Sequence, residues 1–398
     1  MGWGWMRAVC GQPDEVEPFS DSDGGEGAFH RTDAFGEQIL KSKNQSSLRV
    51  AFVYTSKSGM EKYLKRSTVP ETSGGVDAPP DLLAECDSDE TIQAVHQSIA
   101  ERYQVIPVES DENAFETLKH ACPDLVFNIS ERLWGPNRES HIPTVCEILG
   151  LPYTGSDPLT LGLCLVKSRA KEILSYYGIP NPQFWIVEPG DRTPSRIPLP
   201  AIIKPLYEGS SKGIRDANVV KNRTSLEETI RSIAQQYRQP VIVERFLKGR
   251  EFTVGVLGND PDYEVLPIVE INHHLLPKGA NPIYSYEAKW IWDTPDRPLE
   301  IFTCPARISK KLEGQIREVV TVTCKRLNIH DWCRIDVRLD EAEVPNILEV
   351  NPLPGILPRV EDNSCLPKAA RAAGYSYTDL IQRVLGEALK RYGIRDQH

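Results

Sequence analysis

The chain has 398 residues, enough for two or three domains with large buried cores. Hydrophobic residues make up 40% and charged residues 26% of it, which is typical of a globular protein in water. A formal net charge of −10 argues against a broad nucleic-acid-binding face, and no apolar run approaches the ~20 residues of a membrane span. The nine cysteines are scattered without a CxxC pair. We therefore expect reduced thiols in a cytoplasmic protein rather than a disulfide framework or a zinc site.

The N-terminal third divides into an extension and a first domain. Residues 1–48 are rich in Gly, Asp, Glu and Ser without periodicity, and we expect a flexible extension there. Strand patterns then alternate with helical ones, the strands at 48–54, 104–108 and 124–129 and the helices at 89–103 and 112–120. This alternation predicts an α/β domain with a parallel sheet. No GxGxxG follows the first strand, so a dinucleotide site is not indicated.

A polar turn at residues 130–139 follows the last strand of this domain. Ligands of α/β sheets bind at the carboxyl ends of parallel strands, where this turn lies. Glu131, Arg138 and Glu139 are therefore candidates for holding a charged substrate. Two other interpretations stay open, namely solvated surface charges and a helix cap.

The middle of the chain carries an anion-binding pattern. A helix is expected from about 158 to 177 and contains Lys167. Strands at 184–187 and 201–205 lead to Lys204 and then to a loop with Gly209, Ser210, Ser211 and Gly213. Glycines allow several backbone N–H groups to converge on one anion. Phosphate binding is favoured over a plain flexible turn, although the spacing is not that of a Walker loop.

A nucleotide base could lie beside the next pair of strands. Strand 241–245 leads through an apolar connector to strand 251–257. Phe246 and Leu247 could cover an adenine, and Glu251 could reach ribose hydroxyls. Residues 273–293 lack periodicity, and a loop of this length is typical of a lid.

Two strand patterns near the end carry the densest set of polar groups. Residues 331–340 and 346–355 place Arg334, Asp336, Glu349 and Asn351 on neighbouring strands. Two carboxylates and an amide oxygen suit a hard cation such as Mg2+. Arg334 would stand beside the metal and hold an anion.

Seven strings together resemble the D-alanine–D-alanine ligase family of the ATP-grasp superfamily. In family order they are LPYTGSDPLTL, IIKPLYEGSSKGI, VIVERFLKGREFTV, YSYEAKW, CRIDVRLD, LEVNPLPG and LPKAARAAG, spread over roughly residues 124–385. The resemblance implies an α/β (α+β) three-domain ATP-grasp architecture. Its units would be a first parallel-sheet domain at 49–155, a central ATP-grasp domain at 156–244 and a C-terminal catalytic domain at 245–398.

The resemblance also implies roles for individual residues. ATP would be bound by Lys167, Lys204, Glu208, Ser210, Ser211, Glu244, Arg245, Phe246, Leu247 and Glu251. The catalytic group would be Arg334, Lys289, Gly355 and Ser210, with Arg334 and the Gly355 amide at the oxyanion. Ser364 would bind the carboxylate of the second substrate. Apart from the resemblance, Glu131 and Arg138 are expected at the substrate from their place after a strand, and Trp290 from its place in the lid. Asp336, Glu349 and Asn351 would hold two Mg2+ ions, with Mn2+ as a substitute.

Three departures from the family pattern all concern the site of the first substrate. The family's Ser-x-Glu turn after the first strand reads TSKSGME here, and Glu61 is not clearly at the glutamate position. Its HGxxGEDG turn is replaced by residues 128–139, and its lid tyrosine is replaced by Trp290. A tryptophan cannot accept a hydrogen bond as a phenol does.

We therefore predict an ATP-dependent carboxylate–amine ligase that forms an amide through an acyl phosphate. Its substrates would be small molecules, its donor need not be D-alanine, and a homodimer is implied by the resemblance alone. The alternatives are a true D-alanine–D-alanine ligase of cell-wall synthesis, a non-ligating ATP-binding regulator, and another ATP-grasp carboxylase or kinase.

Overall fold

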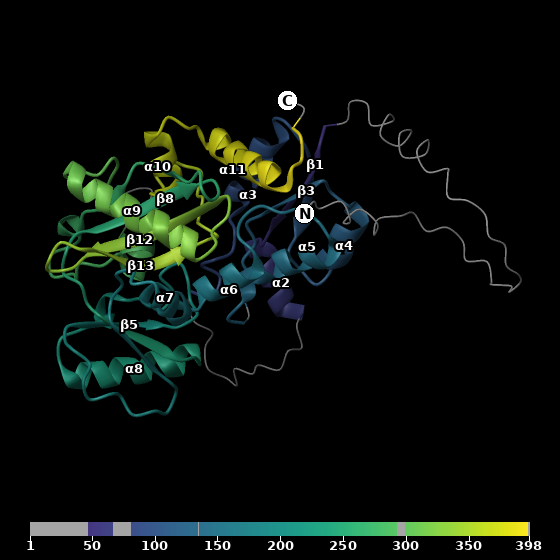
Figure 1. The fold of residues 1–398 in the computed structure, drawn as a ribbon. Coiled ribbons are helices and arrows are strands. Elements are labelled where there is room, and N and C mark those ends of the chain that lie inside the picture. Colours follow the sequence, from purple (N-terminus) through teal and green to yellow (C-terminus); the bar gives the residue numbers. More distant parts are fainter. Residues whose placement is uncertain (1–46, 67–80, 134, 293–298, 397–398) are drawn as a thin grey trace, which may run out of the picture.

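The computed structural model describes residues 47–66, 81–133, 135–292 and 299–396. The described part contains three sheets (Figure 1). The first is formed by β1 (Arg49–Tyr54), β2 (Gln104–Glu109) and β3 (Leu125–Asn128) in the order β2-β1-β3, and all its strands are parallel. The predicted parallel α/β pattern is therefore confirmed. The predicted flexible extension falls almost wholly on residues 1–46, outside the described residues.

Helices cover both faces of the first sheet. On one face Ala51, Val53 and Val126 pack against α4 (Ala114–Ala121) and α5 (His141–Leu149), which follows the short turn η1 (Arg138–Ser140). On the other face Phe52 and Phe127 share a core with α3 (Asp89–Ala100) and with two C-terminal helices, α10 (Cys365–Ala372) and α11 (Tyr377–Tyr392). The two ends of the described chain therefore bury one common core.

The local sequence did not indicate two of the helical features. Residues 57–66 form helix α2 (Lys57–Arg66) directly after the turn that follows β1. The single helix expected at 158–177 is wrong, because the chain forms α6 (Pro158–Leu165) and α7 (Lys167–Tyr176) with Val166 extended between them. A β-branched valine is a weak helix former, and the Lys167 N–H donates to Leu206 O at 3.3 Å instead of continuing α6. Lys167 thus begins a helix rather than lying within one.

The central sheet is antiparallel in the order β4-β7-β5-β6. Its strands are β4 (Phe184–Val187), β5 (Ala201–Pro205), β6 (Val219–Val220) and β7 (Val241–Arg245), with η2 (Asp216–Asn218) before β6. Helix α8 (Arg223–Tyr237) places Leu226, Ile230 and Ile233 on one face of the sheet.

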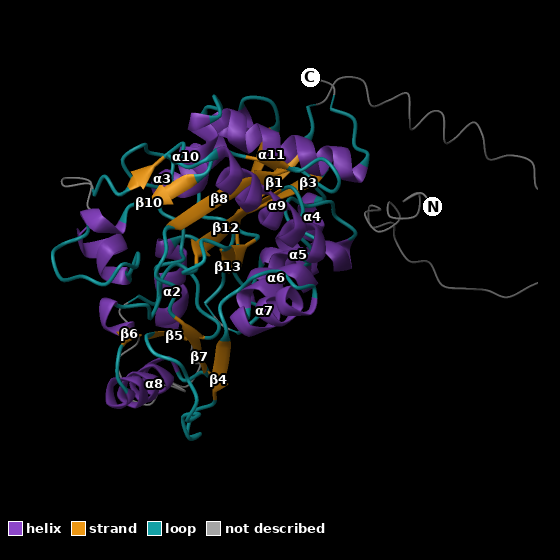
Figure 2. Cartoon of the chain, turned by 60° about the vertical axis from the view of Figure 1, so that its left-hand side comes forward, coloured by secondary structure: helices purple, strands orange, loops and turns teal. Residues whose placement is uncertain are grey.

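The largest sheet has the order β11-β10-β8-β12-β13, with β9 paired to β8. Its strands are β8 (Glu251–Leu257), β9 (Glu264–Val265), β10 (Val269–Ile271), β11 (Phe302–Thr303), β12 (Trp332–Leu339) and β13 (Pro345–Asn351). Helix α9 (Lys310–Arg326) covers one face and α10 the other. The predicted lid segment contains two short helical turns, η3 (His273–Leu275) and η4 (Ala288–Trp292). In both ribbon views α8 and the central sheet lie below the large sheet (Figures 1 and 2).

No helix in the described ranges has both the length and the apolar character that a bilayer span requires.

Candidate active site

A cavity of about 320 Å³ lies where the three sheets meet. Its wall is formed by residues of β5, β7, β8, β12 and β13, by the lid segment, and by the first domain. Most residues singled out from the sequence lie on this wall, namely Glu131, Lys204, Ser210, Ser211, Glu244, Arg245, Phe246, Leu247, Glu251, Lys289, Arg334, Asp336, Glu349, Gly355 and Ser364. Folding therefore brings together groups that are up to 233 positions apart in the chain, Glu131 and Ser364 being the extremes (364 − 131 = 233).

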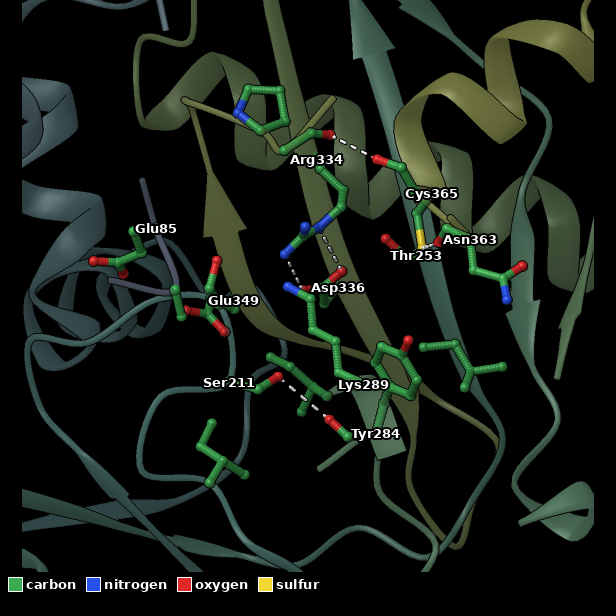
Figure 3. Close-up of a pocket in the computed structure, with 18 of the residues that line it drawn as sticks. Glu85, Ser211, Thr253, Tyr284, Lys289, Arg334, Asp336, Glu349, Asn363 and Cys365 are labelled. Atoms are coloured by element: carbon green, nitrogen blue, oxygen red, sulfur yellow. Dashed lines mark hydrogen bonds and ion pairs between the residues drawn. The ribbon is translucent and has the colours of Figure 1, made fainter. Parts of the chain in front are cut away.

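Strands β12 and β13 supply the acidic floor of the cavity. The antiparallel register sets Asp336 opposite Glu349 and Arg334 opposite Asn351. Because residues two apart on a strand share a face, all four side chains lie on one side of the sheet. Arg334 donates to Asp336 from Nε at 3.2 Å and from Nη2 at 3.1 Å (Figure 3). The Asn351 amide lies 3.4 Å from Asp336 Oδ2, although Asn351 does not line the cavity.

Each of the other carboxylates at this end is also paired with a base. Lys167 Nζ lies 2.7 Å from Glu349 Oε1. Burial alone would raise the pKa of Glu349, but the ammonium groups of Lys167 and Lys204 hold it below its ordinary value. Glu244 lies between Lys171 at 3.0 Å and Lys204 at 2.8 Å, and these two charges outweigh burial to lower its pKa to about 2.

Lys289 comes from the lid turn η4 and extends toward Arg334 and Asp336 (Figure 3). Burial, together with the positive charge of Arg334, lowers the pKa of Lys289 to about 8. The lid also touches the glycine–serine loop, since the Ser211 hydroxyl donates to Tyr284 O at 3.3 Å. The lid segment and the loop thus face the same space.

The apolar end of the cavity lies between β7 and β8. Phe246 and Leu247 are both buried there, and the Arg338 guanidinium lies 4.7 Å from the centre of the Phe246 ring. Glu251 contacts Arg338 at 2.7 Å and His273 at 3.0 Å. Burial would raise the pKa of Glu251, but these partners lower it to about 2. This end offers flat apolar surface beside an ionised carboxylate.

Segments next to the first sheet close the opposite side of the cavity with Lys57, Asp87, Ser88, Thr91, Ile129 and Glu131. Asp87 accepts from the Thr55 N–H at 3.1 Å, in the turn after β1. Burial raises the pKa of Asp87 to about 8, and burial together with neighbouring carboxylates raises the pKa of Glu131 well above its ordinary value. Among the described residues neither carboxylate has a basic side chain within 4.0 Å.

Five of the residues singled out from the sequence do not lie on the cavity wall: Arg138, Glu139, Lys167, Glu208 and Asn351. Arg138 is 2% exposed, and its guanidinium is occupied by Glu85 and by Tyr207 O. It is therefore not a solvated surface charge, and the structure turns it toward Glu85 rather than toward the cavity. Glu208 pairs with Lys212 at 2.6 Å. The backbone of Trp290 belongs to η4, but its side chain lies outside what the structure describes.

Sequence reasoning missed several groups at the site, above all Glu85, Asp87, Lys171 and Lys212. Lys171 is fully buried between Glu244 and Leu348 O, and only tertiary contacts reveal its position. Glu85 and Asp87 lie in a stretch without periodicity. The single signal near them is Ser88, whose hydroxyl accepts from Thr91 N and caps α3. That signal locates a helix start but does not indicate that acids beside it face a cavity.

Comparisons with family models and with known sequences point to the same family. A model of the family described as "D-ala D-ala ligase C-terminus" matches residues 173–386. The chain is 33% identical over 298 residues to the uncharacterized protein y4sG of Sinorhizobium fredii, covering 73% of this chain and 84% of that one. It is 32% identical over 288 residues to the D-alanine–D-alanine ligase of Bordetella pertussis, covering 70% and 84%.

The solved structures agree on the fold. A D-alanine–D-alanine ligase from Bacillus anthracis, in a crystal structure complexed with ATP, superposes with a TM-score of 0.61 at 19% sequence identity. The match covers 87% of this chain and 99% of that one. The predicted α/β (α+β) ATP-grasp architecture with a parallel sheet near the N-terminus is thereby confirmed at the level of fold.

Proposed function

The chain belongs to the D-alanine–D-alanine ligase family, and from this premise we propose that it joins a carboxylate to an amine at the expense of ATP. The observation that carries the proposal is the arrangement of Arg334, Asp336 and Glu349 opposite Lys289 on one cavity wall. A carboxylate is a poor electrophile, so a phosphoryl group must be attached to it before an amine can attack. These residue types supply the charge that such a transfer requires.

In the first step a carboxylate oxygen of the donor attacks the γ-phosphorus of ATP, and ADP leaves. The reaction gives an acyl phosphate, and both the transferred phosphoryl group and the leaving ADP carry negative charge. Lys204 and Lys289, which line the cavity, would hold the phosphate groups by electrostatic attraction, and Lys167 would add its charge from its place beside Glu349. The N–H groups of the loop at 209–213 would add neutral donors. Closure by the lid segment would keep water from the acyl phosphate.

Asp336, Glu349 and Asn351 fit a divalent cation because they present only oxygen-bearing groups on one face of two paired strands. In the described ranges no cluster of three or more His, Cys, Asp or Glu residues is suited to a metal. The site would therefore depend on two carboxylates, the amide and the phosphates of ATP, as suits Mg2+ or its substitute Mn2+. Two such ions would neutralise phosphate charge and orient the transferred group.

In the second step the acceptor amine attacks the acyl carbon, the oxyanion forms, and inorganic phosphate leaves as the C–O bond breaks. The amine loses a proton, and an amide remains. Arg334 and the Gly355 amide would face the oxyanion. Ser364 lies at the same wall, donating to Gly355 O at 3.1 Å, and would hold the acceptor's carboxylate.

The donor in this proposal is an amino acid rather than a plain acid. Asp87 and Glu131 are carboxylates on the cavity wall, and within the described ranges neither has a basic partner, as expected for groups that await an ammonium. Asp87 also contacts the turn after β1, where the family carries its glutamate, whereas Glu61 is exposed on α2. An ammonium bound beside Asp87 would lower its raised pKa and keep it ionised.

The direct test is a matrix of amino-acid pairs incubated with ATP and Mg2+, with phosphate release as the readout and mass spectrometry of the product. Donor labelled with ¹⁸O in its carboxylate should transfer one ¹⁸O to the released phosphate, as an acyl phosphate requires. Robust turnover with D-alanine alone would make the chain a true D-alanine–D-alanine ligase and refute an altered donor. Nucleotide binding without phosphate release for any pair would favour the regulator.

A non-ligating regulator is the weaker alternative because Arg334 lies at the acid pair rather than at the base-binding end. A protein that only binds ATP has no need for a guanidinium at that place. The proposal further includes a cytoplasmic setting, where ATP is abundant, and a homodimer that light scattering of the purified protein would test.

A further inference from the structure

The glycine–serine loop at residues 209–213 lines the cavity and carries two adjacent backbone N–H groups for which the described residues supply no acceptor. Ser210 and Ser211 have φ angles of 49° and 61°, in the left-handed region that few residues other than glycine adopt. Within the described ranges their backbone N–H groups have no acceptor within hydrogen-bonding distance, and both residues line the cavity. Such a conformation persists only where neighbouring groups hold it.

Two carboxylates of the first domain hold the outer N–H groups of this loop. Glu85 Oε1 accepts from Gly209 N at 2.9 Å, and Asp81 Oδ2 accepts from Gly213 N at 3.0 Å. The open pair at Ser210 and Ser211 is therefore fixed from both sides. Gly213 is also sterically required, since its φ is 68° and a Cβ on it would lie 2.4 Å from Pro205 Cγ.

Glu85 is itself held by a buried and electrically balanced cluster. Arg138 Nη2 lies 2.9 Å from both of its oxygens, and Lys212 Nζ lies 3.0 Å from Oε2. Lys212 also contacts Glu208 at 2.6 Å, so two acids face two bases. Because the cluster is neutral, Glu85 can approach the loop without repelling a phosphate there. Burial would raise the pKa of Glu85, but Arg138 and Lys212 lower it to about 2.

Asp81 is anchored on the other side of the loop by the central domain. The Tyr237 hydroxyl of α8 donates to Asp81 Oδ2 at 2.7 Å, and Asp81 is 3% exposed. Each carboxylate thus joins the first domain to the central domain through one end of the loop.

We propose that residues 81–87, here named the clasp, hold the loop at 209–213 in its phosphate-binding form, with Asp81 and Glu85 as positioning residues. The inference rests on the proposed function, because it concerns the same nucleotide site. The central ATP-grasp domain would then carry an incomplete phosphate site by itself. The site would be completed only when the first domain packs against it.

The test measures binding of Mg2+–ADP by calorimetry, which needs no turnover. Removing Glu85 alone would leave Arg138 and Lys212 with excess charge, so the main variant is the charge-balanced double substitution Glu85→Gln with Lys212→Met. Since a hydrogen bond to a charged group is at stake, we expect ADP affinity to fall ~10-fold or more. Tyr237→Phe, which removes one hydroxyl, should weaken ADP ~3-fold and should fold normally.

Kinetics separate positioning from a general loss of structure. The KM for ATP should rise in both variants, while the KM for the donor stays within about twofold, because the donor end is untouched. Glu147→Gln serves as the control. Glu147 is an exposed acid that accepts a hydrogen bond of 2.9 Å from the Tyr153 hydroxyl and has no contact with the loop. Unchanged ADP affinity in both clasp variants would overturn the clasp. Failure of the wild-type protein to bind ADP would instead overturn the proposed function.

Discussion

The two ends of the cavity treat their carboxylates in opposite ways. At the strand pair β12 and β13, and behind it, Asp336, Glu349 and Glu244 each lie within 3.1 Å of a basic group. At the wall beside the first sheet, Asp87 and Glu131 are half-buried, neither has such a partner among the described residues, and their pKa values are raised. In the first arrangement each carboxylate is balanced by a basic group, so the site can bind a phosphate together with a cation without a change in its net charge. The second is costly unless a positively charged ligand arrives.

Arg334→Ala should have the largest effect at the paired end. The oxyanion would lose a charged donor, so turnover should fall by ~10²–10³. ADP affinity should change by less than about threefold, because the lysines still hold the phosphates. Arg326→Ala, which removes an exposed arginine stacked on Tyr177, is the control. Equal losses of turnover and of nucleotide affinity would contradict the role of Arg334.

Asp336→Asn tests the balance of charge at the same end. One carboxylate of the proposed cation site would become neutral, so the Mg2+ concentration for half-maximal turnover should rise at least ~10-fold. The measurement is a Mg2+ titration of phosphate release at saturating ATP. Asp260→Asn, an exposed acid paired with Lys325 on the outer side of the sheet, should leave the titration unchanged. A Mg2+ requirement that does not move would exclude Asp336 as a ligand.

Asp87→Asn tests the end of the cavity without paired carboxylates, and it should weaken donor binding while it stabilises the folded protein. The KM for the donor should rise ~10-fold, because an ammonium would lose its charged partner, while the KM for ATP stays the same. The folded protein binds the Asp87 proton more tightly than the unfolded chain does, since its pKa is raised from 3.8 to about 8. Its contribution to stability is therefore lost as pH rises from about 4 to about 8.

An asparagine resembles the protonated acid at every pH. At pH 7 the variant should consequently be more stable, by up to ~4 kcal/mol for the 3.2 pH units between 3.8 and 7, visible as a higher Tm. Asp89→Asn, two residues further on and exposed, is the matched control. A variant that is both less stable and unaltered in donor KM would show that Asp87 has only a structural role.

The smallest expected effect concerns Lys289, which lies between the two ends. With a pKa of about 8, its ammonium should be ~90% charged at pH 7 and ~10% charged at pH 9. ADP affinity should therefore fall by up to ~10-fold over this range, and Lys289→Arg should flatten the curve because arginine stays charged. Lys278→Arg, at an exposed position of the same segment, should keep the wild-type slope. Identical slopes in all three proteins would contradict a role for Lys289 at the phosphates.

The sequence by itself determined the end of the cavity at β12 and β13, where the carboxylates are paired with basic groups. Local spacing decides which residues of one strand share a face, so Arg334 with Asp336, and Glu349 with Asn351, could be grouped before any fold was known. The strands themselves were also predictable, because buried strands carry continuous apolar patterns. The family strings then connected these residues with Lys204 and the loop at 209–213.

Only the tertiary structure decided the unpaired end and the clasp. Asp81, Glu85 and Asp87 lie in a stretch without periodicity, and the side chains of Asp81 and Glu85 have partners 53 to 156 positions away in the chain. No local pattern records a contact of that range, because it arises from the packing of one domain on another. The same reason explains Arg138, which the sequence placed beside a ligand and the fold turned toward Glu85. Spacing along each strand thus determined which side chains lie together on β12 and β13. Long-range packing determined which acids of the described residues have a basic partner.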